Sequence, residues 1–467
     1  MPLIPPESST DALPASEAVG ASQSFRRAIR SRVINLAWPV FAELSLQTIT
    51  QVVDMAMVGH LGAAAIAAIG LSMQPLWLVM SIFMGLSVGT TALVARLVGA
   101  NNHEEAGHIA KQSLLVSLFI SLIVGVAAFI AAPQIIRLMG AEADALPLGI
   151  SYMRYLVPGY VFMLPAMVAT AALRGAGDTR TPMVINLFVN ILNVLANYTL
   201  IFGHFGFPAM GVDGAGLATT IARIVGAVAL VAVLASGRKV IGIPPGRILQ
   251  FDPEVLKRIV RVGLPATIER VAMSLGMLFY VRTVASLGTV VYAAHVLATN
   301  AESLSYMPGI AISTAAATLV GQGLGAKDPE AAEASGWESC KLGALVMGIM
   351  GVVFFLFPEA ILGIYTDDPE IISLGVVALR VVAFIQIPEA IGFILSGSLR
   401  GAGDTRGVFY VTAIGAWAIR LLLAYIFVIH LHWGLLGAWL AMAADWIFRS
   451  AMFLARFKGG TWKEIDI

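Results

Sequence analysis

The octapeptide Leu-Arg-Gly-Ala-Gly-Asp-Thr-Arg occurs twice in the chain, at residues 173–180 and 399–406. The shift between the copies is 226 residues, and at this shift the surrounding sequence aligns without a gap over a long stretch. Aligned pairs include Pro39 with Pro265, Glu43 with Glu269, Gly62 with Gly288 and Arg154 with Arg380. A repeat of this length predicts that the chain consists of two structurally equivalent halves.

The composition places both halves in a membrane. Of the 467 residues, 58% are hydrophobic and 12% are charged, and the mean hydropathy is +0.86. A soluble protein with this composition would expose large apolar patches. The apolar residues form about twelve runs, from Val33–Val58 to Leu435–Phe457, and about 20 apolar residues span a bilayer as a helix. We therefore predict an all-α membrane protein with twelve transmembrane helices in two six-helix lobes.

The even number of helices in each lobe fixes how the lobes are related. Both lobes enter the membrane in the same direction, so a pseudo-twofold axis along the membrane normal relates them as a parallel repeat. Carriers that work by alternating access use this arrangement and hold their substrate between the repeats. We predict residues 31–236 and 262–457 as the two lobes and 237–261 as a cytoplasmic linker.

Basic residues determine the predicted orientation. They gather in alternate loops, whereas the opposite loops carry acidic residues such as Glu142, Asp144, Asp367 and Asp368. The positive-inside rule then puts both termini in the cytoplasm, for a multi-pass protein of the plasma (inner) membrane. Residues 1–30 are predicted to be a disordered cytoplasmic tail and 458–467 a second cytoplasmic tail.

Several classes of function are excluded by what the sequence lacks. A net charge of +1 does not indicate binding to nucleic acid. A single cysteine, Cys340, excludes an internal disulfide and a cysteine metal cluster. There is no G-x-x-x-x-G-K-[ST] loop and no soluble domain large enough for an ATPase. We therefore expect a monomeric carrier that is not an enzyme, has no cofactor and runs on an ion gradient.

Polar stripes run along several predicted helices. Residues with helical spacing share one face of each helix: Glu43, Gln47, Gln51 and Asp54 on the first, Asn186, Asn190, Asn193 and Asn197 on the fifth, and His295, Thr299, Glu302 and Tyr306 on the eighth. An ionisable group inside a membrane helix costs about 2.5–3.5 kcal/mol on insertion scales, so these faces should avoid lipid. Hydrogen bonds between helices are the alternative explanation for any single Asn or Gln.

The carboxylates are the stronger candidates for function. Asp54 with Asn193 and Asn197 combines a carboxylate with amide oxygens, which suits Na⁺ or a proton as the coupling ion. Tyr280, Ile419 and Leu423 occupy the matching positions of the second half, so this chemistry belongs to the first half alone. Glu43, Gln47, Gln51, Glu269, Glu302 and Glu389 are predicted to line the substrate cleft.

The octapeptide is predicted to be structural. Its glycines can end a helix, its Asp can cap the next helix, and its arginines can hold the loop on the cytoplasmic side.

Together these motifs resemble the multidrug and toxic compound extrusion (MATE) family over residues 30–457. The resemblance rests on the segments at 38–62, 93–100, 173–183, 263–269 and 301–326 and on the second octapeptide. It implies two lobes around a V-shaped central cleft, and export of small amphipathic organic cations in exchange for H⁺ or Na⁺. It also implies a cation site at Asp54, Asn193, Asn197 and Thr219.

The resemblance favours the DinF-type branch over the norfloxacin-exporter branch. The helix-7 acid of the second branch matches Met273, with Glu269 one turn earlier, although its helix-10 acid matches Glu389. In the DinF-type branch the position of Asn197 is often Asp. Because this chain has Asn there, either Na⁺ or H⁺ can be the coupling ion.

Two other functions remain as alternatives. A flippase for lipid-linked or other amphipathic anionic substrates shares the twelve-helix layout, but the charges in mid-membrane are mainly acidic. An ion channel or receptor is disfavoured by the twofold repeat and by the number of helices.

Overall fold

The computed structural model describes residues 15–140, 142–237, 239–243 and 250–467. These residues form helices and connecting loops and contain no β-strand. Eleven of the described helices are long and apolar enough to cross a membrane, judged by length and composition. The helix α1 is the twelfth long helix, and its polar stripe lowers its hydropathy. The predicted fold class is confirmed.

The first lobe contains six helices in chain order. They are α1 (Ala15–Gly59), α2 (Ala63–Gly99), α3 (His103–Leu138), α4 (Ala145–Gly175), α5 (Arg180–Phe202) and α6 (Val212–Ala235).

The second lobe repeats this order with one interrupted helix. It contains α7 (Pro253–Ala285), α8 (Thr289–Gly325), α9 (Pro329–Leu356), the short α10 (Pro358–Leu362), α11 (Pro369–Gly401), the segment α12 (Thr405–Ala413), η1 (Ile414–Leu421), α13 (Leu422–Tyr425) and η2 (Ile426–His430), and finally α14 (Gly434–Gly459) and the single turn η3 (Thr461–Glu464). Both η1 and η2 are π-helical, whereas the equivalent α5 is a regular α-helix.

Both octapeptides form the same helix-to-helix turn. Gly177 and Gly403 have φ angles of +87° and +92°, a left-handed conformation that favours glycine. The Asp178 carboxylate accepts a hydrogen bond from the Thr181 N–H, and Asp404 accepts one from the Gly407 N–H. These contacts confirm the predicted helix stop and cap. They also define one end of the molecule, here called the octapeptide face, which carries both octapeptides and residues 460–467.

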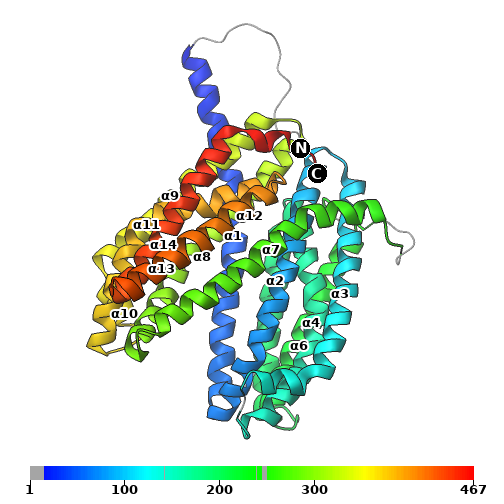
Figure 1. Cartoon of the computed structure of the whole chain (residues 1–467). Helices are drawn as coiled ribbons and strands as arrows, with labels where there is room; N and C mark the ends of the chain where they lie inside the picture. The colour runs from blue at the N-terminus through cyan, green and yellow to red at the C-terminus, as the bar shows by residue number, and fades with distance from the viewer. Residues whose placement is uncertain (1–14, 141, 238, 244–249) are drawn as a thin grey trace.

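The first helix of each lobe crosses to the other lobe. Ile29, Val33 and Val40 of α1 are buried in a core cluster with residues of α8, α9, α11 and α14. In α7, Val255 and Ile259 are buried with residues of α2, α3 and α4. Figure 1 shows α7 running diagonally from the right-hand lobe, beside α3, to the left-hand lobe. The sequence placed Ile29 in a tail (residues 1–30) and the start of α7 in the linker (237–261), whereas in the structure both pack against a lobe.

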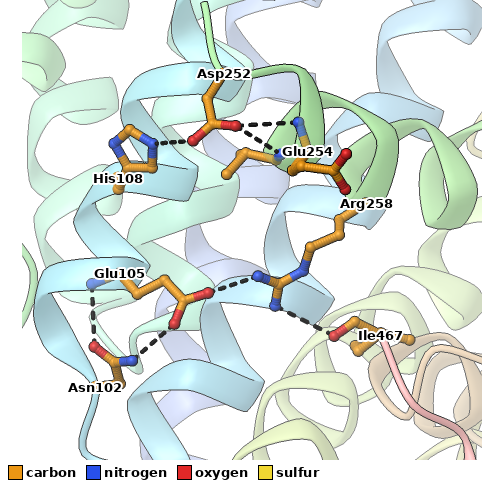
Figure 2. Close-up of polar contacts among 8 residues, drawn as sticks. Asn102, Glu105, His108, Asp252, Glu254, Arg258 and Ile467 are labelled. Carbon is orange, nitrogen blue, oxygen red and sulfur yellow. Dashed lines mark hydrogen bonds and ion pairs between the residues drawn. The ribbon is translucent and has the colours of Figure 1, made fainter.

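Ion pairs hold the crossing helices in place at the octapeptide face. The Arg258 Nη1 of α7 lies 2.5 Å from Glu105 Oε1 of α3, and its Nη2 donates to the Ile467 oxygen at 3.3 Å (Figure 2). In the other direction, the Arg30 Nε of α1 lies 2.5 Å from Glu338 Oε2 of α9. Each crossing helix is thus tied to the lobe that it does not belong to by sequence.

Glycines bring the lobes into backbone contact at this face. A Cβ atom on Gly99 of α2 would lie 2.0 Å from the Gln322 carbonyl oxygen, and one on Gly325 of α8 would lie 1.9 Å from the Arg96 carbonyl oxygen. Only glycine allows this approach, and the two glycines are again related by the 226-residue shift. The lobes are therefore closed together at the octapeptide face, and their ribbons diverge away from it as a V (Figure 1).

Two predicted boundaries need correction. The disordered tail was expected to reach residue 30, but α1 begins at Ala15, because Ile29 is buried and Arg30 is paired; residues 1–14 lie outside the described residues. The linker was expected to reach residue 261, but α7 begins at Pro253, where Asp252 caps it. The last segment, predicted as a cytoplasmic tail, packs against α14, where Trp462 is fully buried with its ring stacked on Phe457 at 4.7 Å.

Candidate functional site

Asp54 lies in a polar cluster formed by α1, α5 and α6. The Asn197 Nδ2 donates a hydrogen bond to Asp54 Oδ1 at 2.7 Å. With its amide turned so that the nitrogen faces the carboxylate, Asn193 donates to Oδ2 at 3.0 Å and to Oδ1 at 3.1 Å. In the opposite orientation, the same nitrogen donates to Thr219 Oγ1 at 3.3 Å. The structure therefore brings together all four residues predicted as a cation site.

The helical spacing explains why these residues meet. Asn193 and Asn197 are four residues apart on α5, so both project from one face, and both are buried. Asn197 Oδ1 is also buried and has no hydrogen-bond donor among the described residues. That free oxygen is an acceptor that a bound cation or a proton-carrying group could use.

Sequence reasoning missed Arg223, which belongs to the same neighbourhood. It lies one turn after Thr219 on α6, and its guanidinium stands 4.0 Å from the centre of the Tyr160 ring. It interacts electrostatically with Asp54, and its Nη1 is buried without an acceptor among the described residues. The signal was present in the i, i+4 spacing of Thr219 and Arg223.

The Asn stripe of α5 divides between two clusters. Asn186, toward the octapeptide face, donates to Glu43 Oε1 at 2.7 Å rather than to Asp54. Gln47 and Gln51, between Glu43 and Asp54 on α1, are exposed in the structure. The stripe therefore serves a structural contact at one end and the Asp54 cluster at the other.

Glu43 and Glu269 each have an internal counter-charge. The Arg174 Nη2 lies 2.6 Å from Glu43 Oε2, and the Arg400 Nη2 lies 2.6 Å from Glu269 Oε1. Both partners of one pair are related to the partners of the other by the 226-residue shift. The octapeptide arginines thus bind glutamates of the crossing helices, a role that the sequence did not predict. While these pairs are formed, Glu43 and Glu269 are poor candidates for binding a substrate cation.

The second lobe has a different polar cluster. Glu302 of α8 and Glu389 of α11 are 5% and 2% exposed, and the Gln386 Nε2 donates to Glu389 Oε2 at 3.3 Å. Beside them, the fully buried Asp445 of α14 pairs with Arg420 and Arg449. Sequence analysis noted neither Arg449 nor its i, i+4 spacing from Asp445.

Comparisons with known proteins agree with this architecture. The MatE family model matches residues 39–199 and 265–426, two segments that follow the internal repeat. The chain is 36% identical over 444 residues to the "Probable multidrug resistance protein NorM" of Thermotoga maritima, covering 93% of this chain and 94% of the relative. It is 29% identical to the "Uncharacterized transporter YisQ" of Bacillus subtilis, covering 92% and 94%.

Solved structures show the same likeness. A structure described as the outward-facing conformation of a multidrug resistance MATE family transporter of the MOP superfamily superposes with a TM-score of 0.85 at 25% identity, covering 93% of this chain and 97% of that one. A MOP superfamily transporter from Pyrococcus furiosus, described as having a binding pocket of reverse polarity, superposes with a TM-score of 0.84 at 25% identity, covering 92% of this chain and 96% of that one. The names do not decide between the DinF-type and norfloxacin-exporter branches. The family model, the relatives and the fold together show that this chain belongs to the MATE family of multidrug efflux transporters.

Proposed function

We propose that the protein is a secondary antiporter that exports amphipathic organic cations in exchange for H⁺ or Na⁺ by alternating access. The observation that carries the proposal is the position of Asp54. It is a carboxylate held by two amides on a helix that spans both lobes, because the first half of α1 packs in the second lobe and its second half carries Asp54. A change in the charge at Asp54 would act on the contact between the lobes.

Pro39 supplies a place where α1 can bend. It lies inside the helix, near the end of the part packed in the second lobe, which includes Val40, and before the part that carries Asp54. A proline inside a helix removes one backbone hydrogen bond and favours a kink. Ion binding at Asp54 would then alter the bend of α1 and shift the lobes, while the substrate cation is held between them.

Glu302 and Glu389 are the proposed contacts for the substrate cation. Unlike Glu43 and Glu269, neither forms an ion pair among the described residues. Two buried carboxylates provide a favourable electrostatic environment for an organic cation. The proposed orientation places the octapeptide face in the cytoplasm of a plasma (inner) membrane, so the lobes would be closed toward the cytoplasm.

Transport in proteoliposomes tests this proposal. Ethidium uptake or efflux is measured first with a pH gradient alone and then with a Na⁺ gradient alone. Transport driven by either gradient is the expected result and identifies the coupling ion. If neither the pH gradient nor the Na⁺ gradient drives transport, in protein that stays folded, the result would contradict the antiporter function.

One observation favours the alternative of an amphipathic anion as substrate. Arg223 adds a positive charge beside Asp54, and its Nη1 is free to bind an acceptor. Competition of ethidium transport by an organic anion and by a second organic cation distinguishes the two functions. Inhibition by the anion alone would favour the alternative.

A further inference from the structure

Asp445 in the second lobe is held between two guanidinium groups. Arg449, one turn later on α14, binds it with two parallel contacts, Nε to Oδ1 at 2.5 Å and Nη2 to Oδ2 at 2.7 Å. Arg420, from the π-helical segment η1, approaches the same carboxylate with Nε 2.8 Å from Oδ2. A Cβ atom on Gly415 would lie 2.2 Å from Asp445 Oδ1, so only glycine lets η1 pack this closely.

The two arginines do not hold Asp445 equally well. The bidentate contact with Arg449 has the geometry of a strong charge-assisted pair and neutralises the carboxylate by itself. The Arg420 Nε is close to the carboxylate but is not aligned for a hydrogen bond, and it is a buried donor without an acceptor among the described residues. Arg420 is therefore the more weakly bound partner. Because Arg449 already neutralises Asp445, the positive charge of Arg420 remains in excess.

Glu302 and Glu389 are two further buried carboxylates on which the charge of Arg420 acts. Arg420 interacts electrostatically with both of them, and they also interact with each other. The Arg420 guanidinium stands 5.7 Å from the centre of the ring of the buried Tyr280. The charge of Arg420 therefore acts on Asp445, which Arg449 already neutralises, and on two buried acids that form no ion pair among the described residues.

The backbone that carries Arg420 departs from regular α-helical geometry. Residues Ile414–Leu421 and Ile426–His430 are π-helical, with only the short α13 between them. A π-helix is rare and occurs frequently at functional sites. The equivalent helix α5 of the first lobe is regular and has Val194 at the matching position, so this arginine is a feature of the second lobe alone.

We propose that Arg420 competes with the substrate cation for Glu302 and Glu389. In the structure it lies on Asp445, and its charge also attracts the two glutamates that a substrate cation would bind. Two positive charges cannot share this buried site without strong repulsion, so Arg420 weakens substrate binding and promotes release. The inference rests on the proposed function and adds a residue that sets its substrate affinity.

Ethidium binding to the purified protein in detergent tests the role of Arg420. The expected result is that Arg420→Gln lowers the dissociation constant about tenfold, because the competing charge is gone. Arg420→Lys keeps the charge and should bind nearly as the wild type does. Arg380→Gln is the matched control, because it removes an exposed arginine of α11 outside this cluster and should leave binding unchanged.

Three outcomes separate the possibilities. Binding by Arg420→Gln that is unchanged or weaker, in protein with a wild-type melting temperature, overturns the role of Arg420 while leaving the transport function intact. Absence of ethidium binding and transport in the wild type would instead remove the proposed function, and this inference with it. If Arg420→Gln does not fold, Arg420→Met keeps the apolar stem and is judged by the same criterion.

A double-mutant cycle distinguishes an effect of Arg420 on the two glutamates from a purely structural effect. In the background of Glu302→Gln with Glu389→Gln, Arg420→Gln should cause no further gain in ethidium affinity. A gain of the same size in that background would show that Arg420 acts elsewhere.

Discussion

The two lobes share their framework and differ in the chemistry of their interiors. Both have the octapeptide turn, the glutamate–arginine pair at 2.6 Å and the proline inside the crossing helix. In the first lobe the interior carboxylate Asp54 is held by amides, whereas in the second lobe Asp445 is held by two arginines beside two unpaired glutamates. Repetition therefore marks residues that hold the fold, and its failure marks residues that are candidates for function.

Breaking the buried triad of the second lobe should have the largest effect. Arg449→Leu leaves Asp445, which is fully buried, with only the poorly aligned Arg420. Losing one partner of a buried ion pair costs about 3–5 kcal/mol. A large fall in the melting temperature of the purified protein is the expected result. A melting temperature within a degree of the wild type would show that Arg449 is not the main partner of Asp445.

The two glutamate–arginine pairs should differ in strength although they are equivalent by sequence. The side chain of Glu269 is 3% exposed and that of Glu43 is 13% exposed, whereas both arginines are 21% exposed, so the pair of Glu269 is the better shielded from water and the stronger of the two. Glu269→Gln should therefore destabilise the protein by about 2–3 kcal/mol, and Glu43→Gln by about 1–2 kcal/mol. Thermal melting of the two variants in parallel checks the order, and the reverse order would contradict this reading of burial.

Replacing residues of α5 by their second-lobe equivalents tests the asymmetry directly. Asn197→Leu removes the donor to Asp54 and should cost about 1 kcal/mol of stability and reduce ion-driven transport about tenfold. The control is Asn190→Ala, which also introduces the equivalent residue of the second lobe, and ion-driven transport should persist in this variant. Equal transport by the two variants would argue against a special role of the Asp54 cluster.

The smallest expected effect lies outside the membrane segments, at Asp252. The His108 hydrogen bond is the main cause that holds the pKa of Asp252 below its usual value (Figure 2). A lowered pKa stabilises the fold above the unfolded value of 3.8, and this contribution is lost as the pH falls through the folded value. Asp252→Asn can still cap α7, so the wild type should melt slightly higher at pH 5 and lose that advantage on acidification. If the difference in melting temperature between the wild type and Asp252→Asn grew on acidification, the result would contradict this account of the Asp252 pKa.

The sequence predicted the repeat, the fold class and the residues around Asp54 because each of them is visible as a regular spacing of residues along the chain. Apolar runs determine the spans, and spacings of three and four residues determine which side chains share a helix face. The shift of 226 residues then showed where the halves differ.

The sequence could not predict contacts that depend on how the helices cross. The pairing of Glu43 with Arg174 requires the end of α4 to lie against α1, and the pairing of Arg258 with Glu105 requires α7 to enter the other lobe. Arg449 and Arg223 were missed for a different reason. Each lies one turn from a residue of interest, but a single arginine in an apolar helix does not show which acid it approaches.

Transport by Asp54→Asn in proteoliposomes tests the central claim most directly. Asp144→Asn is the matched control, since it also removes a carboxylate and Asn can still accept the capping hydrogen bond from the Ala145 N–H. The account predicts that Asp54→Asn loses gradient-driven ethidium transport while Asp144→Asn transports as the wild type does. Full gradient-driven transport by Asp54→Asn, at equal amounts of folded protein, would contradict it.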